Sequence, residues 1–177
     1  MTSNLTNNDP YNPHYLKQYN KRWFLFATIQ GAPEFDHIPV FSIDRIKKLK
    51  PLHPEKEPFI KNAPNIEEYL EGVIGVSTKL NKTRHSVFLK FHPARYDYVK
   101  TKPLHDSQSC TDHTCIVQIN VVLNRELEQL ILSYGADVRV ISPEILKNRI
   151  QEIINNMAKN YIQGKKEITG NGNLFEL

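Results

Sequence analysis

The sequence predicts a protein of the α+β class, and two observations lead to this prediction. First, the first third of the chain carries short apolar segments that follow one another closely, at residues 15–18, 22–29 and 40–43. Three or four such strands are the material of a small β-barrel. Second, residues 83–162 alternate strand-like and helix-like segments, which predicts a small α/β sandwich.

The apolar segments of the first third predict a β-hairpin and a further strand. Residues 22–29 start with an arginine and continue as an apolar run, which is typical of a strand with one face in a core. Asn20 and Lys21 predict the tight turn before it. After a loop, residues 40–43 predict the next strand. We expect residues 45–49 to continue extended, with Lys47, Lys48 and Lys50 pointing outward.

A proline-rich stretch then separates this part from the rest. Residues 51–65 contain four prolines among charged residues, at positions 51, 54, 58 and 64, and this pattern favours an extended linker. Residues 66–72 predict a short helix that Asn65 caps and Gly72 ends. The apolar residues 73–76 are expected to dock this segment on a core.

The second half carries the clearest strand and helix signals. Strands are predicted at residues 86–91, 115–123 and 138–141, and helices at 93–99, 124–134 and from 144 onward. Ser142-Pro143-Glu144 is a helix start, with a cap, a proline and an acidic residue at the positive end of the dipole. The last helix carries an aliphatic stripe that indicates core or dimer packing: Leu146, Ile150, Ile153, Ile154, Met157 and Tyr161.

Composition excludes some classes of protein. The chain has 177 residues, of which 40% are hydrophobic and 24% charged, as in ordinary soluble domains. No apolar run reaches the roughly 20 residues of a membrane span, and the Asn-rich start is no secretion signal. We therefore expect a cytoplasmic protein. The net charge of +4 permits an anionic partner without demanding one.

The two cysteines, Cys110 and Cys115, lie close to His105 and His113. Thiolates and imidazoles suit zinc, but this spacing matches no zinc pattern. Reduced thiols at a hairpin tip are the better interpretation. We expect neither a metal nor a cofactor.

Several segments, in the same order along the chain, resemble those of a known family. Trp23-Phe24-Leu25 after Arg22, followed by Asp44-Arg45-Ile46, resembles the WYL domain of bacterial transcriptional regulators, with phenylalanine in place of the usual tyrosine. The segments 98–108, 124–128 and 132–144 resemble the C-terminal extension that follows WYL domains. Together the matches cover roughly residues 11–162.

This resemblance implies an Sm-like β-barrel followed by a ferredoxin-like extension. The expected domains are a partial WYL domain at 11–52, a linker with a short helix at 53–82 and the extension at 83–162, with flexible tails at 1–10 and 163–177. WYL domains normally open with one more strand, and a winged helix-turn-helix normally stands upstream. We expect this sequence to lack both, which leaves a sheet edge that invites pairing.

The candidate ligand site is the mouth of the expected barrel. Arg22 and Arg45 are either surface arginines, with Arg45 paired to Asp44, or the grip of an anion pocket, since guanidinium groups bind phosphate bidentately. Lys17 would add a cation, and Tyr15 or Trp23 would stack a base. WYL domains are regarded as sensors of nucleotides or single-stranded nucleic acid, and the resemblance extends that expectation to these residues.

A second basic group lies in the extension. Its members are Lys90, His92, Arg95, Lys100, Lys102 and His105. Lys100, Lys102 and His105 stand beside Ser107 and Gln108 in a proline-stiffened loop, as an oligonucleotide backbone site needs. The alternative is a solvated surface.

Catalysis is not expected. His105 and Ser107 are near neighbours in sequence and should point apart, and no phosphate loop or acid–base carboxylate pair occurs. The sequence thus predicts a ligand-sensing module of a WYL-type regulator that binds a nucleotide or single-stranded DNA or RNA. It would act as a homodimer or with a partner that carries a DNA-binding domain. The alternative is a protein-interaction or dimerisation scaffold with no small ligand.

Overall fold

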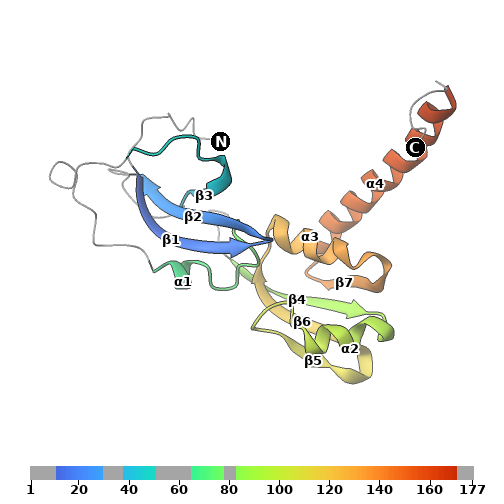
Figure 1. The fold of residues 1–177 in the computed structure, drawn as a ribbon. Coiled ribbons are helices and arrows are strands. Elements are labelled where there is room, and N and C mark those ends of the chain that lie inside the picture. The colour runs from blue at the N-terminus through green and yellow to red at the C-terminus, as the bar shows by residue number, and fades with distance from the viewer. Residues whose placement is uncertain (1–10, 30–37, 51–64, 78–82, 171–177) are drawn as a thin grey trace. The chain divides into compact units, whose positions relative to one another are not determined.

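The computed structural model describes residues 11–29, 38–50, 65–77 and 83–170 (Figure 1). The chain divides into two compact units. Unit 1 comprises residues 1–84 and 124–127, and unit 2 comprises residues 85–123 and 128–177. Each unit combines strands with helical segments, so the predicted α+β class is confirmed. The predicted linker prolines and the first ten residues lie outside the described residues.

Unit 1 is built on an antiparallel sheet of order β1-β2-β3, formed by β1 (Tyr11–Tyr19), β2 (Arg22–Ile29) and β3 (Val40–Ser42). Asn20 and Lys21 connect β1 to β2 with φ angles of 47° and 62°, as the two central residues of a type I′ turn require. The predicted hairpin is therefore confirmed. β1 starts earlier than predicted, because an edge strand tolerates Pro13 at a register shift.

The sheet of unit 1 is open, so the predicted barrel is wrong. Within the described residues, β1 and β3 each pair only with β2. Closing a barrel requires the outer strands to bond to each other. β3 has only three residues, and the chain then leaves the sheet in a 3₁₀ turn, η1 (Ile43–Arg45).

The prediction that residues 45–49 continue extended is wrong at Arg45, whereas Ile46 does have extended backbone angles, φ −77° and ψ 109°. Arg45 ends η1, and residues 46–50 belong to no strand. The Ser42 hydroxyl donates a hydrogen bond to the Asp44 carboxylate, which holds the turn locally. Such short side-chain bonds compete with strand pairing. Lys47, Lys48 and Lys50 are exposed, as expected.

The core of unit 1 lies on one face of the sheet. It is formed by Phe26, Ile38, Ile66, Tyr69 and Val76. The helix α1 (Ile66–Tyr69) begins at the predicted cap, where the Asn65 side chain accepts a bond from the Glu68 N–H at 3.3 Å. Residues 73–76 after α1 are buried, so the predicted docking of this segment is confirmed.

Asn124 and Glu126 complete unit 1. The Asn124 side-chain oxygen accepts from the Leu127 N–H at 2.9 Å, which confirms the predicted cap of α3 (Arg125–Ser133). Its Nδ2 donates to the carbonyls of Ile74 at 2.8 Å and Ser77 at 3.0 Å. Glu126 Oε1 accepts from the Ser77 N–H at 3.0 Å. These side chains satisfy backbone groups of a buried irregular segment that has no ladder of its own.

Unit 2 has the element order strand, helix, strand, strand, helix, strand, followed by a long helix. Its elements are β4 (Arg84–Phe91), α2 (Pro93–Thr101), β5 (Ser109–Thr111), η2 (Asp112–Thr114), β6 (Ile116–Val122), α3, η3 (Gly135–Asp137), β7 (Val138–Ser142) and α4 (Glu144–Gly170). The strands are ordered β5-β6-β4-β7. This arrangement is ferredoxin-like, so the predicted fold of the extension is confirmed.

Most of these elements follow the predicted pattern, and β5 does not. β4 and β6 bury alternate apolar residues, as sheet strands with one covered face do. β5 has three exposed polar residues and is held by its antiparallel partner β6. A strand that short carries no periodicity, so only tertiary pairing defines it. No helix in the described part of the chain is both long and apolar enough to cross a membrane.

Candidate ligand-binding site

The register between β1 and β2 shows on which face of the sheet each predicted site residue of these strands lies. Residues opposite each other in an antiparallel pair share a face, and alternate residues along a strand do too. Tyr15 lies opposite Phe26, and Tyr19 opposite Arg22. Tyr15, Lys17 and Arg22 therefore lie on the core face of the sheet. Trp23, opposite Gln18, lies on the other face.

Arg22 forms an ion pair with Asp44, and the charge of Arg45 acts on the same carboxylate. The Arg22 guanidinium lies 3.7 Å from Asp44 Oδ2, and both side chains are about half exposed, at 54% and 53%. The hydrogen bond from Ser42 lowers the pKa of Asp44 most, and the positive charges of Arg22 and Arg45 lower it further. The two arginines and this carboxylate thus carry a net charge of +1 at neutral pH. We call Tyr15, Lys17, Arg22 and Arg45 the two-arginine site.

Lys17 differs from the two arginines because it is partly buried. Burial lowers the pKa of its ammonium, and the Glu126 carboxylate opposes that shift. Burial and the same carboxylate raise the pKa of Tyr19. Lys17 therefore contributes a charge that Glu126 already balances in part, and the arginines supply most of the positive potential of the site.

The two candidate stacking residues have different environments. Tyr15 is 37% exposed and packs edge-on against Phe26, with 6.3 Å between ring centroids and a 64° angle between planes. This contact fixes the ring on the face that carries the cations. Trp23 is 51% exposed and is therefore no core residue. It shares its face with Leu16, not with Lys17 or Arg22.

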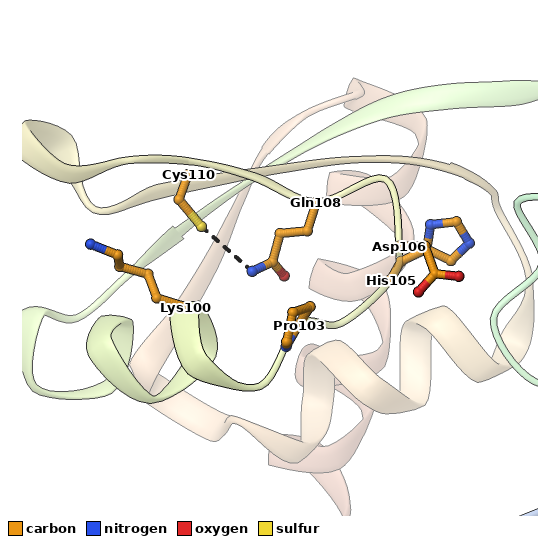
Figure 2. Close-up of a pocket in the computed structure, with 6 residues that line it drawn as sticks. All are labelled: Lys100, Pro103, His105, Asp106, Gln108 and Cys110. Atoms are coloured by element: carbon orange, nitrogen blue, oxygen red, sulfur yellow. Dashed lines mark hydrogen bonds between the residues drawn. The ribbon is translucent and has the colours of Figure 1, made fainter.

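In unit 2, the predicted residues Lys100 and His105 line one pocket of about 460 Å³ (Figure 2). The other lining residues are Pro103, Asp106, Gln108 and Cys110. Gln108 Nε2 donates to the Val99 carbonyl at 3.0 Å and lies 3.5 Å from Cys110 Sγ. Gln108 is therefore occupied in holding the loop to α2.

Lys100 is already paired. Its ammonium lies 2.7 Å from Asp112 Oδ1, and the Tyr96 hydroxyl donates to the same oxygen at 3.0 Å. Asp112 raises the pKa of Lys100 in consequence. Burial, followed by this carboxylate, raises the pKa of Tyr96 above its ordinary value. An anionic ligand would have to compete with Asp112 for Lys100.

His105 and Ser107 do not point apart, so that expectation is wrong. His105 Nδ1 lies 2.8 Å from Ser107 Oγ and accepts from the Ser107 N–H at 3.1 Å. The Asn120 N–H donates to the same hydroxyl at 2.8 Å. Nδ1 is thus an acceptor. The bond from Asn120 fastens the loop to β6, and the bend of the loop brings the side chains of His105 and Ser107 into contact.

The structure adds Tyr98 to the second basic group, beside Arg95, which the sequence already placed in that group. Tyr98 on α2 is 47% exposed, and its ring centroid lies 5.8 Å from both the Arg95 guanidinium and the Lys102 ammonium. These distances are within the range of cation–π attraction. Positions 95, 98 and 102 are three and four residues apart. This spacing in the sequence could have indicated that the three side chains lie together. Arg95 also pairs with Asp137 at 3.2 Å.

The cysteines form no metal centre within the described residues. Cys110 is exposed and Cys115 is half-buried, and both are free thiols. No group of three histidine, cysteine, aspartate or glutamate side chains in that part of the chain is arranged to hold a metal ion.

Comparison with known proteins bears on the second unit. Residues 83–158 match the family model of the WCX domain, the C-terminal extension of WYL domains. This match covers most of the segment that the sequence assigns to the extension. The resemblance of the chain to WYL-type regulators is therefore confirmed.

The comparison with curated proteins gave no match. Among solved structures, the proteasome accessory factor B/C (PafBC) of Arthrobacter aurescens is similar with 14% sequence identity and a TM-score of 0.30. The likeness covers 80% of this chain and 21% of that one, so this chain spans about a fifth of the length of PafBC. A TM-score this low carries no argument about function.

Proposed function

We propose that this chain is the ligand-sensing module of a WYL-type transcriptional regulator, and that it binds a nucleotide or a short single-stranded nucleic acid. The WCX match supports the regulator class. The observation that carries the ligand class is the exposed ion pair of Arg22 with Asp44, whose carboxylate also feels the charge of Arg45. The module senses rather than catalyses. Its effect on transcription is exerted through a DNA-binding domain in the same protein or in a partner.

In this proposal the two-arginine site holds phosphate. A phosphate that approaches Arg22 displaces Asp44, whose ion pair is half exposed and therefore contributes little stability. Guanidinium forks then bind the phosphate oxygens bidentately. Lys17 adds a weaker, partly balanced charge. Tyr15, on the same face of the sheet, is the stacking residue for a base.

In this proposal the second basic group contributes less to ligand binding. Lys100 is paired with Asp112, and His105 contacts Ser107. Lys102 lies against Tyr98 and forms no ion pair within the described residues, so we propose Lys102 with Tyr98 as the better nucleotide contact of unit 2.

Fluorescence anisotropy with a labelled single strand of about six nucleotides tests the proposal. Wild-type protein should bind saturably at low salt. The double variant Arg22→Ala/Arg45→Ala should bind at least about tenfold more weakly. Its plot of log affinity against log salt should flatten by about 0.7 for each phosphate that the variant no longer neutralises.

A matched control separates the site from general charge. Lys47→Ala/Lys48→Ala removes the same charge from exposed positions of unit 1. This control should keep nearly wild-type affinity. If both double variants lost the same oligonucleotide affinity, the loss would reflect the net charge of the protein and not the two-arginine site. No saturable binding by folded wild-type protein would reject the ligand-sensing function and favour the interaction scaffold.

A further inference from the structure

The pocket of about 460 Å³ in unit 2 carries opposite charges at its two ends. It is lined by residues of α2, the following loop and β5, and its volume lies within the range of small-molecule sites. Figure 2 shows Lys100 on one side of the pocket and Asp106 on the other, with Pro103 and Gln108 between them. The pocket therefore presents an ammonium group at one end and a carboxylate at the other.

The Asp106 carboxylate is available to a ligand. The residue is exposed, and no ion pair among the described residues involves it. A cationic group of a ligand would therefore pair with Asp106 without displacing a cation of that part of the chain.

Lys100 can bind a second carboxylate without leaving Asp112. A lysine ammonium carries three N–H donors, and Asp112 Oδ1 accepts one of them at 2.7 Å. The same carboxylate raises the pKa of Lys100, so the ammonium stays charged at neutral pH. Asp112 is not among the lining residues, whereas Lys100 is. The remaining donors of Lys100 are therefore free to bind a carboxylate that belongs to a ligand.

Gln108 holds the middle of the pocket in place. Its Nε2 donates to the Val99 carbonyl at 3.0 Å, and its Oε1 accepts from the Leu104 N–H at 2.9 Å. These two bonds fasten the loop to the end of α2. The separation of Lys100 and Asp106 is thus set before a ligand arrives, which lowers the entropic cost of binding.

The charges around the pocket decide which class of ligand fits. Lys100 contributes one positive charge, and Asp106 and Asp112 contribute two negative charges, so their sum of −1 disfavours a phosphate or another simple anion. A simple amine would pair with Asp106 and leave the free donors of Lys100 unused. A molecule that carries both charges uses both ends of the pocket and adds no net charge.

We propose that this pocket binds a small linear zwitterion, with its ammonium group at Asp106 and its carboxylate at Lys100. Amino acids with a remote amino group and short peptides share this chemistry. The inference does not depend on the ligand proposed for unit 1, because none of the residues that line the pocket belongs to the two-arginine site.

A titration of the chain with 5-aminopentanoate at neutral pH, followed by amide chemical shifts in NMR, tests the proposal. We expect saturable shifts centred on Lys100, Asp106 and Gln108. Pentanoate and pentylamine each retain only one of the two end charges, so each should bind at least about threefold more weakly, as the loss of one exposed ion pair implies. Glycylglycine separates its end groups by the same number of bonds, and the tighter of the two zwitterions distinguishes an amino acid from a peptide as the ligand.

Asp106→Asn is the variant to compare, because Asp106 is exposed and its loss should leave the chain folded. It should weaken binding of 5-aminopentanoate by about threefold or more and should not weaken binding of pentanoate. Glu152→Gln makes the same charge change at an exposed position of α4 and should bind the zwitterion as the wild type does.

Three results would overturn the proposal. The first is binding of pentanoate or pentylamine as tight as that of the zwitterions. The second is wild-type affinity for 5-aminopentanoate in Asp106→Asn. The third is the absence of saturable shifts with either zwitterion up to about 50 mM.

Discussion

The Arg22 guanidinium and the Asp44 carboxylate form an exposed ion pair at 3.7 Å, on the face of the sheet that also carries Tyr15 and Lys17. The same carboxylate feels the charge of Arg45. In the proposed site, Asp44 would therefore compete with an anionic ligand for Arg22.

Removing this competitor should strengthen ligand binding. Asp44→Asn keeps an acceptor for the Ser42 hydroxyl and removes the negative charge. We expect affinity for a short single-stranded oligonucleotide to rise by about threefold to tenfold, as removal of one opposing charge near a phosphate site implies. Anisotropy titration at fixed salt measures it. Glu67→Gln changes the charge equally at an exposed position on α1 and should leave affinity unchanged. Weaker binding by Asp44→Asn would contradict phosphate capture by Arg22.

Substitution of the two candidate stacking residues should have different effects on oligonucleotide affinity. Tyr15→Ala removes the ring on the cationic face, and we expect a loss of about 1–3 kcal/mol in binding with an unchanged salt slope. Trp23→Ala should leave the affinity within about twofold, because Trp23 lies on the opposite face. Thermal melts establish that both variants are folded. The reverse ranking would place the ligand on the other face of the sheet.

Patterns among neighbouring residues predicted most of the fold. The parts that were not predicted depend on pairing between strands that are distant in the sequence. The Asn20–Lys21 turn, the Asn65 and Asn124 caps and the α4 stripe are all encoded by neighbouring residues. The predicted barrel was wrong because closure depends on the two outer edges, which no local pattern encodes. β5 was missed because three polar residues carry no periodicity.

The candidate site was predicted in part for the same reason. That Asp44 lies beside Arg22 as well as Arg45 depends on η1, which no pattern in the sequence indicates. The faces of Tyr15 and Trp23, by contrast, follow from the turn. A two-residue turn pairs Tyr19 with Arg22, and alternation along each strand then separates the two aromatic residues.

Asn124 should be among the most sensitive positions of unit 1. Asn124→Ala removes the α3 cap and leaves the carbonyls of Ile74 and Ser77 without their donor. Lost caps cost about 1 kcal/mol and each unsatisfied buried group about 1–3 kcal/mol, so we expect a loss of about 3 kcal/mol or more. Urea unfolding measures it. Asn120→Ala, at an exposed position of β6, should change stability by less than about 0.5 kcal/mol. Similar midpoints for the two variants would contradict this account of Asn124.

Tyr96 should make stability depend on alkaline pH. Burial of its ring, with the Asp112 hydrogen bond, raises the pKa of its hydroxyl above the ordinary value of 10.0. An unfolded tyrosine loses its proton near that value while the folded one keeps it. The stabilisation is therefore complete below pH 10 and is lost as pH rises from there through the folded pKa.

Tyr96→Phe isolates this contribution. The difference in free energy of unfolding between wild type and Tyr96→Phe should be constant below the ordinary tyrosine pKa and should shrink above it. Comparison with the variant cancels the other tyrosines whose pKa is raised, Tyr19 and Tyr134. A difference that stays flat at alkaline pH would mean that Tyr96 ionises as it does in the unfolded chain.

The most direct measurement for the central claim is a titration of the labelled protein with a short single-stranded oligonucleotide, followed by amide chemical shifts in NMR. The claim predicts saturable shifts centred on Tyr15, Lys17, Arg22 and Arg45, with Trp23 and its neighbours on the other face less affected. Shifts confined to α2 and the 103–110 loop, or no saturable shifts, would contradict the assignment of ligand sensing to the two-arginine site.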